Sequence, residues 1–130
     1  MVITGGLVVD GTGAPPFSGD VAIRNGKIVG VSRWLYRLAP ARSYIDARGK
    51  IVAPGFIDVH THVEANLSAS AQFKPANFLK QGVTTIITGN CGRSRTDVAA
   101  MFSAMERNGS YINVATLVGH NSVRRQVMEQ

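Results

Sequence analysis

The sequence predicts an α/β protein whose two parts follow different patterns. In residues 1–54, short segments rich in β-branched residues are separated by glycine, asparagine and proline, as in a small sheet. In residues 55–130, strand-like and helix-like segments alternate in units of about 30 residues, which is typical of βα units in a parallel sheet. Apolar residues make up 45% of the chain and charged residues 17%, so a packed globular protein is expected.

The first part is expected to form an antiparallel sheet. Its candidate strands are "LVVD", "DVAIRNGKIVGV" and "SYIDARGKIVA". Asn25 and Gly26 separate "VAIR" from "KIVGV", and this dipeptide supplies the positive φ angles of a tight type I′ hairpin. The segment "GTGAPPFSGD" is expected to be a loop, because its prolines and glycines disfavour a strand.

The second part is expected to contain three strands, each followed by a helix. The strands are "GFIDV", "VTTIIT" and "YINVATLV". In the first helix, "PANFLKQG", Pro75 suits the first turn and Gly82 the position after the last turn. The third helix, "SVRRQVMEQ", has Ser122 as its expected N-cap. The second helix, "TDVAAMFSAMERNG", is expected to end at Gly109 and to bury one apolar face, made of Val98, Met101, Phe102 and Met105.

Charge and composition exclude several classes of function. The 14 basic and 8 acidic residues give a net charge of +6, but the basic residues are scattered and do not alternate with aromatic ones, so no nucleic-acid partner is expected. A small anionic substrate and an acidic partner surface each account for the charge. No apolar stretch reaches the roughly 18 residues that span a bilayer, so no membrane is expected. The lack of a secretory signal and the single cysteine, Cys91, indicate a cytoplasmic protein.

The residues with metal-binding chemistry recur at one position of the βα pattern. From His62 to Cys91, and from Cys91 to His120, the spacing is 29 positions, and each of these residues lies just beyond a predicted strand. The carboxyl ends of parallel strands are where α/β proteins bind ligands. The pattern therefore predicts a site at this end of the sheet.

His60 and His62 have the spacing of a metal-binding pair. Side chains two positions apart on a strand point to the same face, so both imidazoles can reach one ion. A thiolate from Cys91 on the next strand would be a third ligand and would favour Zn²⁺ over harder ions. The alternative interpretations are a chance histidine pair at a strand end and a cysteine that only packs in the core.

Four stretches carry a resemblance to a known family: "GGLVVDGTGAPPFSGDVAIRNGKIVGV", "IDARGKIVAPGFIDVHTH", "LKQGVTTIITGNCG" and "NVATLVGHNSVRRQVM". The chain resembles the N-terminal part of the amidohydrolase superfamily, and within it the N-acyl-D-amino-acid deacylases (D-aminoacylases). "APGFIDVHTH" marks the superfamily broadly. "GNCG" and "GHNSVR" are more specific for the deacylase group.

The resemblance implies a fold and a reaction. Residues 55–130 would be the first three βα units of a (β/α)8 barrel, and residues 1–54 a small antiparallel β-sandwich domain completed by later strands. The reaction would be zinc-dependent hydrolysis of the amide of an N-acyl-D-amino acid, with one or two zinc ions. His60, His62 and Cys91 would bind metal. Substrate-binding positions would be His120, Arg124, Arg93 and Arg95.

The sequence departs from the family pattern in two ways, and these lower the activity that we expect from it. Glu64 stands where an aspartate is common in the group. A complete barrel needs about 250 residues, so the catalytic aspartate and further histidine ligands are expected downstream and no catalytic residue is assigned here. We expect little activity from these 130 residues alone, as from a piece of a longer enzyme. Self-association, a hydantoinase-like, dihydroorotase-like or deaminase activity, and a non-catalytic metal-binding fragment remain open alternatives.

Overall fold

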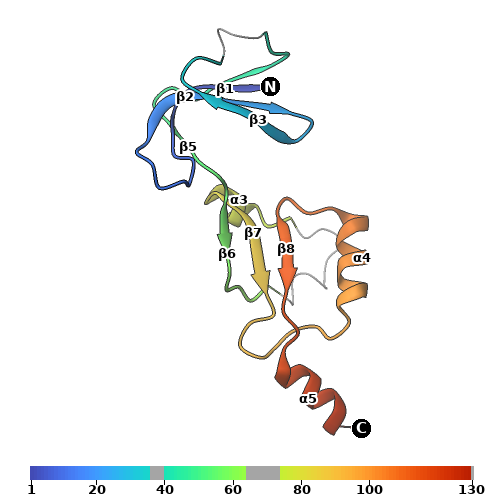
Figure 1. Cartoon of the computed structure of the whole chain (residues 1–130). Coiled ribbons are helices and arrows are strands. Elements are labelled where there is room, and N and C mark those ends of the chain that lie inside the picture. The colour runs from blue at the N-terminus through green and yellow to red at the C-terminus, as the bar shows by residue number, and fades with distance from the viewer. Residues whose placement is uncertain (36–39, 64–73, 130) are drawn as a thin grey trace. The chain divides into compact units, whose positions relative to one another are not determined.

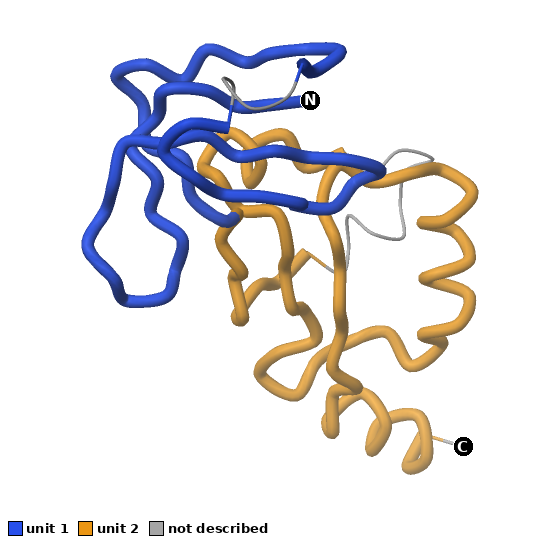
Figure 2. Tube along the Cα trace, turned by 45° about the horizontal axis from the view of Figure 1, so that its top comes forward, with its two compact units in different colours: residues 1–54 blue, residues 55–130 orange. Residues whose placement is uncertain are grey.

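The structure, a computed structural model, describes residues 1–35, 40–63 and 74–129. Glu64 lies outside these ranges. The chain forms two compact units, Met1–Pro54 and Gly55–Gln130, which Figure 2 shows in different colours. Among the described helices, none has the length and apolar character needed to cross a membrane.

Unit 1 is built on one five-stranded mixed sheet (Figure 1). The strand order is β3-β2-β1-β4, and β5 also pairs with β1. The side chains of Val2, Val8, Val21 and Ala47 are buried in this unit. The strands are β1 (Val2–Val8), β2 (Phe17–Arg24), β3 (Lys27–Ser32), β4 (Tyr44–Asp46) and β5 (Ile51–Val52).

The predicted hairpin at Asn25 and Gly26 is confirmed. Their φ angles are 51° and 72°, and Arg24 pairs with Lys27 across the turn. The predicted loop "GTGAPPFSGD" is shorter than expected. Phe17 already pairs with Val8, so β2 begins directly after the two prolines, which cannot donate to the ladder.

The prediction that this sheet is entirely antiparallel is wrong for its last two strands. β4 and β5 both run parallel to β1. The β2–β3 hairpin occupies one edge of β1, and the connection 33–43 carries the chain to the other edge. After that crossover the chain enters β4 in the same direction as β1, and a crossover of this kind is what parallel pairing requires.

Unit 2 has the alternating strand and helix order that the sequence predicts. Its parallel sheet has the order β6-β7-β8, and Figure 1 shows these strands side by side with α4 beside them. The elements are β6 (Phe56–Asp58), α3 (Ala76–Lys80), β7 (Val83–Thr88), α4 (Val98–Asn108), β8 (Asn113–Thr116) and α5 (His120–Met128).

The core of unit 2 lies between its sheet and α4. Met101 of α4 is buried with Ile86 of β7, Val63 and Ile112, while Phe102 and Met105 are partly buried against this cluster. These are residues of the predicted apolar face of the helix. Burying side chains of this size stabilises by about 1.5–3 kcal/mol each, which holds α4 against the sheet.

Two predicted helix C-termini are confirmed, Pro75 precedes α3 as its N-cap rather than lying in its first turn, and one predicted N-cap is wrong. Gly82 follows the last turn of α3, and Gly109 ends α4, with φ angles of 80° and 73°. Ser122 is not the N-cap of α5, because the helix already begins at His120 with Gly119 as its N-cap. The carbonyl of Gly92 accepts hydrogen bonds from the backbone N–H groups of residues 121 and 122, so a neighbouring loop caps this helix.

Candidate metal centre

His60, His62 and Cys91 come together at the carboxyl end of β6 and β7. Their ligand atoms all lie within 4.8 Å of one another, and in the described part of the chain they are the group of histidine, cysteine and carboxylate side chains placed to hold an ion. Cys91 Sγ lies 3.4 Å from His60 Nε2. The two imidazole rings are 5.3 Å apart between centroids, at 63°.

The segment that carries the two histidines is anchored by the residues that alternate with them. Thr61 and Val63 are buried, whereas His60 and His62 are exposed. The Thr61 N–H and hydroxyl both donate to the carbonyl of Ile87, which extends the pairing with β7 beyond the end of β6. This alternation turns both imidazoles away from the core.

Cys91 is presented by a tight loop with an unusual backbone. Its φ angle is 56°, and Gly89 and Gly92 on either side have φ angles of 79° and 75°. A left-handed conformation is uncommon for a residue with a side chain. A β-carbon on Gly89 would collide with the carbonyl of Leu117, so glycine is needed there for packing as well as for φ.

The three donors suit a zinc ion. Tetrahedral coordination with bond lengths of about 2.0 Å to nitrogen and 2.3 Å to sulfur places a nitrogen and a sulfur ligand about 3.5 Å apart. The distance of 3.4 Å from Cys91 Sγ to His60 Nε2 is close to this value. Two imidazoles and a thiol are also the donor types that select zinc among the common divalent ions.

The four predicted substrate-binding residues follow β7 and β8 but are not joined to this cluster. His120 opens α5 and Arg124 follows one turn later, while Arg93 and Arg95 lie in the loop after Cys91. All four are exposed. Within residues 1–35, 40–63 and 74–129, no hydrogen bond or ion pair links them to the metal-binding cluster.

Sequence reasoning missed the polar residues that hold the site together. Asn90 and Thr88 both donate to the carbonyl of Thr61, between the two histidines. Ser94 accepts a hydrogen bond from the N–H of Gly119, and its own N–H donates to the hydroxyl of Ser122. Asn90 stands directly beside Cys91 in "GNCG", which is the one sequence signal that could have pointed to it.

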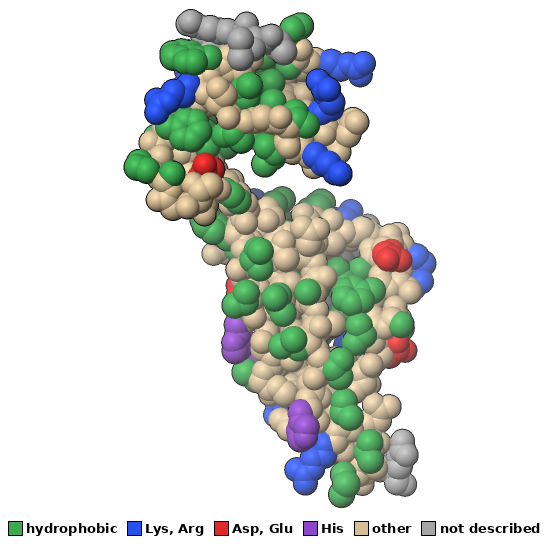
Figure 3. Space-filling view, viewed as in Figure 1, with side chains coloured by type: hydrophobic (Ala, Val, Ile, Leu, Met, Phe, Trp, Pro, Cys, Tyr) green, Lys and Arg blue, Asp and Glu red, His purple; other side chains and the backbone are tan. Residues whose placement is uncertain are grey.

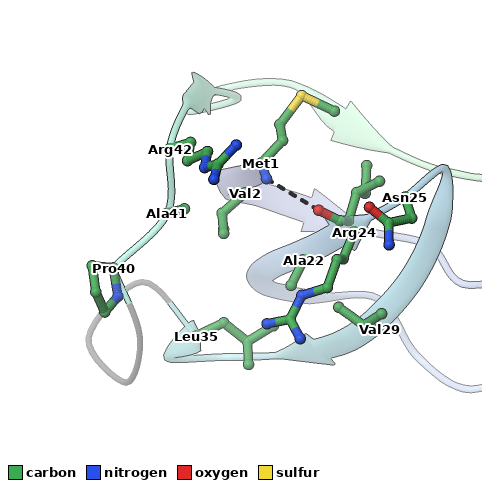
Figure 4. Close-up of a pocket in the computed structure, with 11 residues that line it drawn as sticks. Met1, Val2, Ala22, Arg24, Asn25, Val29, Leu35, Pro40, Ala41 and Arg42 are labelled. Carbon is green, nitrogen blue, oxygen red and sulfur yellow. Dashed lines mark hydrogen bonds between the residues drawn. The ribbon is translucent and has the colours of Figure 1, made fainter.

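Figure 3 shows histidine side chains at the surface and Lys and Arg side chains scattered over the face in view. A separate hollow in unit 1, shown in Figure 4, is lined largely by apolar side chains together with Arg24 and Arg42. It contains none of the predicted site residues.

Comparison with known proteins places the chain in a family. The sequence profile of the amidohydrolase family matches residues 43–128, and the chain belongs to that family. It is 36% identical to the N-acyl-D-aspartate deacylase of Alcaligenes xylosoxydans over 98% of this chain and 30% of that protein. The chain therefore spans about 30% of the length of the curated relatives it matches.

Solved structures show the same relationship. The N-acyl-D-glutamate deacylase of Bordetella bronchiseptica, in complex with zinc and a phosphonate inhibitor, superposes with a TM-score of 0.78 at 37% identity, covering 95% of this chain and 30% of that one. A D-aminoacylase structure described with a binuclear metal centre gives a TM-score of 0.83 at 32% identity, over 99% of this chain and 31% of the other.

Proposed function

We propose that this chain is part of a zinc-dependent amidohydrolase that cleaves the amide bond of N-acyl-D-amino acids. The observation that carries the proposal is the convergence of His60, His62 and Cys91 within 4.8 Å, at the strand ends of a chain similar to deacylases. The solved deacylases hold zinc or a binuclear metal centre, which supports one or two zinc ions here.

The residues of this chain would hold the metal and orient it. The Cys91 thiolate and the imidazoles of His60 and His62 would be its ligands, and the pairing of Thr61 with β7 would hold the histidine segment in place. When bound, zinc polarises an amide carbonyl and activates water for hydrolysis. The described cluster contains no carboxylate, so we assign no proton-transfer residue within it.

The substrate would be recognised through its carboxylate. Arg93 and Arg95 follow Cys91 in its loop, and His120 and Arg124 lie on the helix that this loop caps. Arginine pairs well with carboxylates because its fork of N–H groups can donate to both oxygens. The net charge of +6 is consistent with a small anionic substrate.

We also propose a place for both units in a larger fold. The parallel order β6-β7-β8, with sequential strands as neighbours, supports the first three units of a (β/α)8 barrel for residues 55–130. The sheet of residues 1–54 would be one layer of a β-sandwich.

A thiol that must stay reduced to bind metal favours the cytoplasm. A homo-oligomer is compatible with this arrangement.

The test is hydrolysis of N-acetyl-D-glutamate and its L-enantiomer by the product of the whole reading frame that contains residues 1–130. We expect release of the free D-amino acid only, loss of turnover with a chelator, and recovery with zinc. Replacement of the thiolate ligand in Cys91→Ala should lower kcat/KM by several orders of magnitude. Turnover that is indifferent to the chelator, or that requires a cyclic amide or a nucleobase instead, would contradict the proposal.

A further inference from the structure

The two segments that carry the proposed metal ligands are joined by one side chain that is not itself a ligand. The Asn90 Nδ2 donates to the carbonyl of Ile87 at 3.1 Å and to the carbonyl of Thr61 at 3.4 Å. Thr61 lies between His60 and His62, and Asn90 immediately precedes Cys91. A single amide group therefore spans the distance between the histidine segment and the cysteine loop.

From these contacts we infer that Asn90 is a positioning residue, which sets the location of the Cys91 thiolate relative to the histidine pair. The inference rests on the metal centre proposed above and adds a residue to it. The hydrogen bonds of the Asn90 amide go to the backbone carbonyls of Thr61 and Ile87, so it acts through the backbone that carries the ligands.

The chemistry of the side chain explains why asparagine suits this position. A primary amide has two N–H groups on one nitrogen, so it can donate to two carbonyls at once. Aspartate has the same shape but no donor when ionised, and its charge would face two carbonyl oxygens. Glutamine is longer by one methylene and would not reach the same two acceptors from this backbone position.

The surrounding hydrogen bonds make the position of Asn90 well defined. Thr88 is fully buried, its hydroxyl donates to the carbonyl of Thr61, and it accepts from the N–H of Val63. These contacts hold the histidine segment on β7. Asn90 extends the same network by one step, from β7 to the loop that presents Cys91. The left-handed conformation of Cys91 leaves that loop dependent on such support.

The experiment titrates the purified protein with Co²⁺, because a cobalt–thiolate bond gives a near-ultraviolet charge-transfer band. We expect Asn90→Ala to weaken Co²⁺ binding by about 10-fold to 100-fold, as do other changes to residues that orient metal ligands, and to shift or weaken this band. Circular dichroism of the metal-free variant checks that it is folded. If Asn90→Ala does not fold, Asn90→Ser is used with the same expectations.

Asn113 offers a matched control. Its amide also donates to a β7 carbonyl, that of Thr84, and to the hydroxyl of Thr85, but it lies at the opposite end of β7 from Cys91. Asn113→Ala should therefore leave the Co²⁺ affinity and the band unchanged. Equal weakening in both variants, or wild-type binding by Asn90→Ala, would overturn the inference while leaving the metal centre in place.

A double-mutant cycle separates positioning from general stability. In a Cys91→Ala background, no thiolate remains to be positioned, so adding Asn90→Ala should change the Co²⁺ affinity by less than about 2-fold. The same 10-fold loss in this background would overturn the inference. Failure of the wild-type protein to bind Co²⁺ would instead overturn the proposed metal centre, and this inference with it.

Discussion

Cys91 adopts a backbone conformation that few residues with a side chain adopt. A φ angle of 56° is costly for a non-glycine residue, and such strain is found mostly where a function requires it. Here the strain coincides with the placement of a sulfur atom 3.4 Å from an imidazole nitrogen. The conformation is therefore an independent argument, beside donor chemistry, that this residue has a functional role.

The pH dependence of unit 1 can be predicted from one carboxylate. Hydrogen bonds from the Arg48 guanidinium and backbone lower the pKa of Asp46 from 3.8 to about 2, and the same pair raises the pKa of Arg48. Because the folded-state pKa is lowered, the stabilisation is present above pH 3.8 and is lost as the pH falls toward 2.

Denaturant unfolding across this pH range measures the effect. Asp46→Asn should flatten the loss of stability between about pH 4 and pH 2 relative to the unmodified protein. The effect should be small and weaker at high salt, because the two side chains are 55% and 82% exposed. Identical pH profiles for the two proteins at low salt would show that this pair does not contribute.

At the residue scale, the sequence predicted the candidate metal ligands but not the hydrogen bonds that hold them in place. The spacing of His60, His62 and Cys91 follows from two simple periodicities, alternation along a strand and repetition of the βα unit. The acceptors of Asn90 are backbone carbonyls, and which carbonyl lies within reach depends on how the segment after β6 pairs with β7. That register is a tertiary property, with no signature in the residues themselves.

The second and third βα units are joined by close backbone packing between the Cys91 loop and α5. A β-carbon on Gly119 would lie 2.5 Å from the carbonyl carbon and oxygen of Gly92 and 2.7 Å from the nitrogen of Arg93. Backbone atoms cannot move aside as a flexible side chain can. Glycine is therefore required at this N-cap for space, since its own φ of −73° is open to any residue.

Gly119→Ala should consequently destabilise the protein by about 1–3 kcal/mol, as overpacking of a tight contact generally does. It should also weaken metal binding, because the displaced atoms belong to the loop that carries Cys91. Thermal unfolding and metal titration measure the two effects. Gly30→Ala is the control, because its new methyl group would meet only side-chain atoms, no nearer than 3.4 Å. Equal behaviour of the two variants would refute the packing argument.

At the element scale, the sequence predicted the strands and helices well where local chemistry determines them. Asn25 and Gly26 form the turn because few other dipeptides tolerate both φ angles, and Gly109 ends its helix for a similar reason. The start of α5 was mispredicted because a carbonyl from another loop caps it. The parallel pairing of β4 was missed because strand direction depends on a long connection rather than on the strand's own residues.

For the molecule as a whole, a metal that binds unit 2 should stabilise that unit. All three proposed ligands lie in Gly55–Gln130. A ligand that binds only the folded state, at about 100 times its Kd, adds about 2.7 kcal/mol of stability. Zinc should therefore raise the Tm of unit 2 and slow amide hydrogen exchange in β6 and β7.

Cys91→Ala provides the comparison for this measurement. Loss of one of the three ligands should remove most of the zinc-dependent shift, while the metal-free Tm changes little because Cys91 is exposed. An equal shift in the variant would mean that zinc binds elsewhere.

The sheet of unit 1 also has a consequence for how the protein is made. β1 pairs with β2 on one edge, but its other edge is occupied by β4 and β5, which end at Val52. A ribosome adds about 5–20 residues per second, so a nascent chain that has already formed β1 and β2 must wait seconds for its remaining partners. During that interval one edge of β1 is open to other chains, and recruitment of a chaperone would be most useful before Val52 emerges.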